Sequence, residues 1–166
     1  MNAICRIGAV LSIVAAASSR SASVVVAAPQ SSAPASPAVR CTSLLSIAEV
    51  QRVTGLTDVK IVLETSTRPE QYSCGYSAAG LSAFNLQLRT GENGRRTANA
   101  LSASASSLKL EAVAGLGVRA SWASSQATLY VDTGRNFLAV AWSRPEQPPA
   151  MRKWLEALAR VVVPRI

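Results

Sequence analysis

The chain has 166 residues, of which 49% are hydrophobic and 16% are charged, and it carries a formal net charge of +8. The length allows one folded domain and argues against two, and the composition excludes a charge-rich disordered chain. The sequence contains no histidine, which excludes Ser-His-Asp and Cys-His catalysis, histidine-bound zinc and an imidazole pH switch within it.

The N-terminal region has the pattern of a signal peptide. After a positive charge near the start, residues 7–17 form an apolar stretch that suits export and is too short to span a bilayer. Small residues offer cleavage sites after residue 17 and after residue 27, and an uncleaved anchor over residues 7–28 is the alternative. We expect a signal peptide over residues 1–27 and an extracytoplasmic protein, either secreted or held in the cell envelope.

A linker follows the predicted signal peptide. Residues 28–40 are mainly proline, serine and alanine, a composition that favours an extended chain and cannot form a packed core. The single folded domain is therefore predicted over residues 41–166.

The cysteines predict a disulfide. Of the three cysteines, Cys5 falls within the signal peptide, which leaves Cys41 and Cys74 as a pair in an oxidising compartment. The alternative is a lipid anchor on Cys41. Arg40 stands where a lipidation motif has a small residue, and Cys41 lies far from the apolar stretch, so we favour the disulfide.

The folded region begins with a short helix, predicted over residues 47–54. Ser46 can cap its N-terminus, Glu49 completes a capping box three residues later, and Gly55 suits the C-terminal end.

Three strands are predicted next, over residues 59–65, 72–77 and 83–90, from β-branched and alternating residues. Residues 66–71 form the loop between the first two. Apolar and polar residues alternate most clearly in the third strand, which indicates a sheet with one buried and one wetter face.

A central helix is predicted over residues 95–107 from their alanine content, after a glycine-containing break at residues 91–94. Residues 108–113 fit either the end of this helix or a strand. Three further strands are predicted over 118–123, 127–131 and 136–142, the last two joined as a hairpin.

The chain ends with an amphipathic helix that Pro148 and Pro149 open and Pro164 ends. The apolar residues at helical spacing are Met151, Trp154, Leu155, Leu158 and Val162. The order of elements predicts an α+β fold: an antiparallel sheet of about five to six strands flanked by N-terminal, central and C-terminal helices.

Short motifs are spread along the folded region. They are Cys41-x-x-Leu44-Leu45 leading into Ala48-Glu49-Val50 and Gly55, then Cys74-Gly75-Tyr76, then Gly115-Leu116-Gly117-Val118-Arg119-Ala120. With the signal peptide and linker, they resemble a domain-of-unknown-function family of small exported envelope proteins. Members occur mainly in GC-rich Gram-positive bacteria, and many are lipid-anchored. The resemblance covers roughly residues 41–163 and implies no catalytic residue, and this chain departs from the anchored members in lacking a good lipidation motif.

One motif offers a candidate for catalysis. Asp132-Thr133-Gly134 resembles the aspartic-protease triplet, whose chemistry needs two carboxylates that share a proton, so a single copy requires a homodimer. Arg135 stands where that family has a small residue, and aspartate and glycine are ordinary turn residues. We favour a turn and keep an aspartate-dependent hydrolase that uses Asp132 in a homodimer as an alternative. No metal site or cofactor is predicted.

The positive charge is the second functional signal. Two basic pairs, Arg95 with Arg96 and Arg152 with Lys153, are candidates for a surface that contacts an anionic partner. The alternative is a solvated basic surface of compositional origin. Nucleic acid is not expected as a partner of an exported protein without a basic-aromatic motif.

The predicted function is a non-catalytic binding or interaction module, not an enzyme. Its partner is expected to be an envelope protein, an anionic wall polymer or a lipid headgroup, without membrane attachment after signal cleavage. A secreted enzyme inhibitor is a further alternative, with an exposed loop such as 66–71 or 91–96 as its contact.

Overall fold

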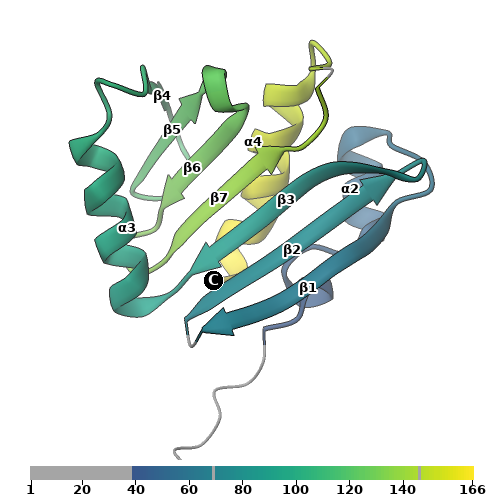
Figure 1. The fold of residues 1–166 in the computed structure, drawn as a ribbon, viewed down its shortest axis with the longest axis horizontal. Helices are drawn as coiled ribbons and strands as arrows, with labels where there is room; N and C mark the ends of the chain where they lie inside the picture. The colour runs from purple at the N-terminus through teal and green to yellow at the C-terminus, as the bar shows by residue number, and fades with distance from the viewer. Residues whose placement is uncertain (1–38, 69, 146) are drawn as a thin grey trace, which may run out of the picture. The chain divides into compact units, whose positions relative to one another are not determined.

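The computed structural model describes residues 39–68, 70–145 and 147–166. The predicted signal peptide and most of the predicted linker lie outside these residues. In the described ranges, four α-helices accompany one seven-stranded antiparallel sheet of order β1-β2-β3-β7-β6-β5-β4 (Figure 1). The fold is therefore α+β, as predicted, with seven strands where about five to six were expected.

The elements follow one another without a long connection. The helices are α1 (Cys41–Leu44), α2 (Ile47–Thr54), α3 (Gly91–Ala103) and α4 (Met151–Val162). The strands are β1 (Lys60–Arg68), β2 (Gln71–Ala78), β3 (Leu81–Arg89), β4 (Glu111–Val113), β5 (Arg119–Ala123), β6 (Thr128–Asp132) and β7 (Phe137–Trp142). Two meanders, β1 to β3 and β4 to β7, join where β3 pairs with β7.

Two of the sequence expectations were wrong at the level of elements. The predicted loop 66–71 lies mostly in strands, because β1 extends to Arg68 and β2 begins at Gln71. The predicted break at 91–94 lies inside α3, which begins at Gly91. The two segments that the inhibitor alternative offered as contacts therefore lie mostly in strands, for 66–71, and in a helix, for 91–96.

The sheet has two faces, and successive residues of β7 point to them in turn. Leu138 and Val140 of β7 point to the first face and belong to the main core, which α1, α2 and α4 cover. Phe137 and Ala139 point to the second face, where Ala98 of α3 packs against them. Figure 1 shows α2 and α4 behind the strands and α3 beside β6 and β7.

The main core contains the tryptophans. Trp122 and Trp142 are buried on the first face, and Trp154 of α4 packs against the same core with its ring 6.0 Å from that of Trp142. Leu155 and Leu158 of α4 are completely buried, as the amphipathic spacing predicts. No helix in the described ranges combines the length and apolarity that crossing a bilayer requires.

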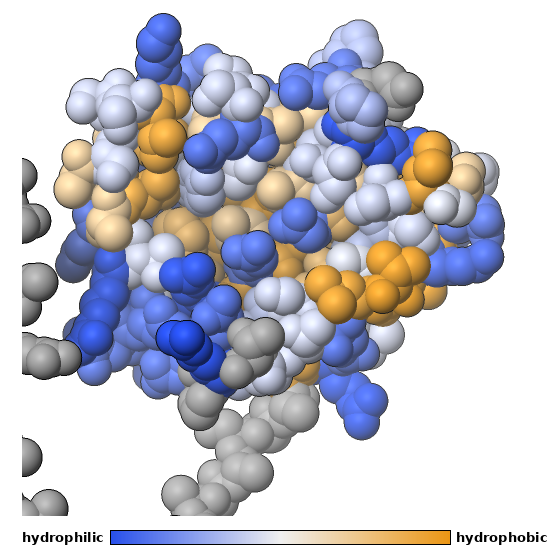
Figure 2. Space-filling view, in the orientation of Figure 1, coloured by the Kyte–Doolittle hydropathy of each residue, from blue (hydrophilic) through white to orange (hydrophobic). Residues whose placement is uncertain are grey.

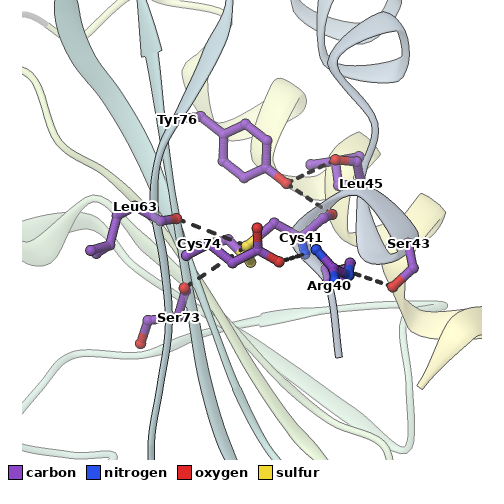
Figure 3. Close-up of a disulfide and its surroundings, with 9 residues drawn as sticks. Arg40, Cys41, Ser43, Leu45, Leu63, Ser73, Cys74 and Tyr76 are labelled. Carbon is purple, nitrogen blue, oxygen red and sulfur yellow. Dashed lines mark hydrogen bonds between the residues drawn. A yellow bond between two sulfur atoms is a disulfide. The ribbon is translucent and has the colours of Figure 1, made fainter. Parts of the chain in front are cut away.

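The expected disulfide ties the start of the domain to the sheet. Cys41 and Cys74 are bonded, with their Cα atoms 5.6 Å apart, and both are buried (Figure 3). The Tyr76 hydroxyl donates to the carbonyl oxygen of Leu45 at 2.8 Å, which holds the segment after α1 against β2. Because the bond occupies the sulfur that a lipid anchor on Cys41 would need, it disfavours that alternative.

Candidate functional site

A groove lies between α3 and the second face of the sheet. Its volume is about 380 Å³, and we call it the α3 groove. The strand residues that line it are Gln87, Arg89, Tyr130, Phe137 and Ala139. Figure 2 shows hydrophobic atoms at the floor of this hollow, over β6 and β7, with hydrophilic side chains around it.

Strand register explains why the groove forms at this place. Ala139 of β7 lies between Gln87 of β3 and Tyr130 of β6, so the three side chains form one row across the second face. A methyl group between two long side chains leaves a hollow in that row. In the next row, Arg89 lies beside Phe137, and α3 covers Phe137.

The helix supplies the opposite wall. Thr97, Leu101 and Ser104 of α3 and its C-terminal end line the groove, together with Ala100 and Leu108. Leu101 is half-buried and packs against the same small cluster as Phe137. The groove therefore has an apolar floor and wall with a few polar groups at defined positions, as small-molecule sites have.

Arg89 is the charged residue of the groove. Its Nη1 donates to the Thr97 hydroxyl at 3.0 Å, and that hydroxyl donates to the carbonyl oxygen of Asn93 at 2.8 Å. Among the described residues, no carboxylate lies within ion-pair distance of Arg89. Asp132 lies in the same row, beyond Phe137, but it pairs with Arg119, whose Nη2 is 3.2 Å from Asp132 Oδ2. The groove thus has one uncompensated positive charge held in a fixed position.

Tyr130 contributes a neutral hydroxyl. Burial raises the pKa of this phenol, so it stays protonated at neutral pH. The hydroxyl donates to Gln126 Oε1 at 2.5 Å. Tyr130 therefore offers a ligand its ring and an oxygen acceptor, without a charge.

Asp132 has the partners of a turn residue. Its Oδ1 accepts a hydrogen bond from the Gly134 backbone N–H at 2.8 Å, and its Oδ2 accepts one from Arg119 Nη2. Within the parts of the chain that the structure describes, no group of three or more acidic or cysteine residues is arranged to hold a metal ion.

The structure separates the four predicted basic residues. Arg95 and Arg96 are on α3 at the second face, whereas Arg152 and Lys153 are on α4 at the first face. Arg96 pairs with Glu92 at 2.5 Å.

Arg152 is engaged on its own face. It binds both Glu111 and Glu156, at 2.5 and 3.0 Å, and lies over the Trp122 ring. The four predicted basic residues consequently do not form one continuous surface.

Sequence reasoning missed the groove. It placed Arg89 on the wetter side of a strand and gave that position no role. The available signal was an arginine on the polar side of β3, but the hollow in front of it depends on Ala139 and on α3. Only the folded chain brings these segments together.

No family model, curated protein or solved structure matches this chain. Its function therefore has to be inferred from the geometry of the α3 groove.

Proposed function

We propose that the chain is an exported, non-catalytic binding module that takes a small ligand into the α3 groove. The groove itself is the observation that carries the proposal: its volume of about 380 Å³ lies in the range of small-molecule sites, which is about 300–1,000 Å³. The Cys41–Cys74 disulfide supports an oxidising compartment, which agrees with the predicted signal peptide.

The groove lining favours binding over catalysis. Thr97, Ser104 and Tyr130 are the hydroxyl residues that line it, and Thr97 and Tyr130 already donate to carbonyl groups of the protein. A hydroxyl nucleophile needs an adjacent general base. The described lining residues include no carboxylate, cysteine or histidine that would serve as one.

The distribution of charge favours a small ligand over a long anionic polymer. A polyanion gains affinity from a continuous row of cations. Here the basic residues of α3 and α4 lie on opposite faces of the sheet, and two of them, Arg96 and Arg152, are paired with carboxylates.

The proposal is tested by an NMR screen of the disulfide-bonded full chain against small fragments, with equal numbers of anionic, cationic and neutral compounds. Ala100 is an exposed residue that lines the groove, so Ala100→Trp fills the groove without entering the core. Ala103 is exposed on the same helix outside the groove, and Ala103→Trp is the matched control.

We expect fragment-induced shifts confined to α3, β3, β6 and β7, lost in Ala100→Trp and kept in Ala103→Trp. The proposal fails if no fragment shifts these elements. It also fails if the shifts survive in Ala100→Trp, because the ligand would then bind elsewhere.

A further inference from the structure

Arg89 differs from the paired basic residues of the described structure. Arg96, Arg119, Arg152, Arg165 and Lys60 each form an ion pair with a carboxylate. Arg89 forms none, although it is half-buried and borders an apolar floor. A charge beside such a surface interacts with an opposite charge more strongly than one surrounded by water.

The guanidinium group of Arg89 is also oriented before any ligand arrives. Thr97 accepts one of its five N–H donors and is itself fixed by the Asn93 carbonyl, so the group is attached to α3. The remaining donors have no protein acceptor among the described residues. A binding group that is already ordered loses little conformational entropy when it meets its ligand.

We propose that the natural ligand of the α3 groove carries a single carboxylate on an apolar body, and that Arg89 binds that carboxylate. This inference rests on the proposed function, because it assigns a ligand class to the same groove. The planar guanidinium matches a carboxylate with two parallel hydrogen bonds. Arg89 is the one cation among the described lining residues, so it balances one negative charge and leaves a polyanion uncompensated.

The rest of the groove fits the apolar part of such a ligand. Ala139 leaves the space in the floor, and Leu101 of α3 and Leu108 from the turn after it line the opposite wall. Gln87 lies on the same face of β3 as Arg89, two residues away, and its amide can donate beside the carboxylate. The small volume favours a compound of metabolite size.

The test compares carboxylates with their neutral amides. 2-Naphthoate and octanoate are each titrated into the disulfide-bonded full chain, followed by NMR, beside 2-naphthamide and octanamide. Arg89→Gln removes the charge. Arg52→Gln is the matched control, because it makes the same change of charge at an exposed residue of α2, on the opposite face of the sheet.

We expect at least one carboxylate to bind the groove about tenfold or more tightly than its amide, since hydrogen bonds between charged groups are stronger than those between neutral groups. Arg89→Gln should remove this preference and leave amide binding unchanged, and Arg52→Gln should change neither. Arg89→Lys keeps the charge without the fork and should retain part of the preference, which provides a second test if Arg89→Gln folds poorly.

Equal binding of acids and amides in the groove would overturn the carboxylate assignment and leave the proposed function standing. An acid preference that survives Arg89→Gln would overturn the role of Arg89. If neither acid shifts the groove elements, the carboxylate assignment also fails, and the fragment screen then decides separately whether the groove binds any ligand.

Discussion

Glu49 joins the N-terminus of α2 to the last residues of the chain. Its Oε2 accepts from the Ser46 backbone N–H at 2.9 Å, which completes the capping box. Arg165 donates to both carboxylate oxygens, at 2.5 and 3.0 Å, and also to the Leu44 carbonyl at 2.9 Å. The hydrogen bond from Arg165 is the main reason why the pKa of Glu49 falls from its usual 4.5 to about 2, with the bonds from Ser46 next.

Because the pKa of Glu49 is lower in the folded state, the stability of the protein depends on pH through this residue. The contribution of ionised Glu49 is present in full above pH 4.5 and is lost as the pH falls toward 2. Glu49→Gln keeps an acceptor for Ser46 but removes the ion pair. We expect it to lower the free energy of unfolding at pH 7 and to flatten the pH dependence between 4.5 and 2, as measured by urea denaturation.

Glu92→Gln is the control for this experiment. Glu92 pairs with Arg96 on the exposed surface of α3, where an ion pair contributes about 0.3–0.5 kcal/mol. If Glu49→Gln retains the acid-dependent loss of stability of the parent protein, Glu49 is not the group responsible for it.

At the scale of elements, the position of α3 depends on Gly94. A Cβ atom at this residue would lie 2.6 Å from the carbonyl oxygen of Arg89 and 3.1 Å from both Asn136 Cα and Phe137 N. All three are backbone atoms, which cannot rotate away. The absence of a side chain at Gly94 therefore allows α3 to lie directly on the ends of β3 and β7 and to form one wall of the groove.

Gly94→Ala should displace α3 from the sheet. Alanine favours a helix over glycine by about 1 kcal/mol, but overpacking against backbone costs about 1–3 kcal/mol. Because the contact at 2.6 Å is with backbone, we expect a cost toward the upper end of this range, and therefore a net loss of stability of about 1–2 kcal/mol in chemical denaturation and a weaker fragment affinity in the groove.

Asn99→Ala, exposed on the same helix, is the control and should change stability by less than about 0.5 kcal/mol. Stability of Gly94→Ala at or above that of the parent would contradict the close contact.

The elements that the sequence predicted best have local signals at their ends. The helix expected over 47–54 is α2 with the same bounds, because the capping box and Gly55 define both ends within the segment itself. The strand expected over 83–90 is β3, displaced by one or two residues, because the alternation of apolar and polar residues is intrinsic to it.

The elements that were missed depend on partners elsewhere in the chain. Gly94 indicates a break when only its neighbours are considered, and its actual role follows from contact with β3 and β7. Residues 108–113 fitted either a helix end or a strand, and β4 lies among them as a strand of three residues that pairs with β5 and carries little signal of its own. The groove has the same origin, since Arg89, Thr97 and Ala139 acquire a common role only when three segments meet.

At the scale of the whole molecule, the disulfide and the groove belong to different faces of the sheet. Cys41 and Cys74 are part of the core under α1, α2 and α4, whereas α3 covers the groove on the second face. The cross-link closes a loop of 33 residues. By restricting the unfolded chain, a loop of this length stabilises the folded state by about 3–4 kcal/mol.

Replacing both cysteines, as Cys41→Ser with Cys74→Ser, should therefore lower the free energy of unfolding by about 3–4 kcal/mol in urea denaturation. Parent protein that is unfolded and refolded with reductant should show the same loss, which separates the missing bond from the new serines.

At low temperature, where the variant is still folded, the fragments identified in the screen should bind the α3 groove with unchanged affinity, because no groove residue contacts the bond. A variant that stays folded but loses the groove shifts would show that the two faces are coupled through the strands between them. A variant as stable as the parent would show that the unfolded chain gains little freedom when the loop is opened.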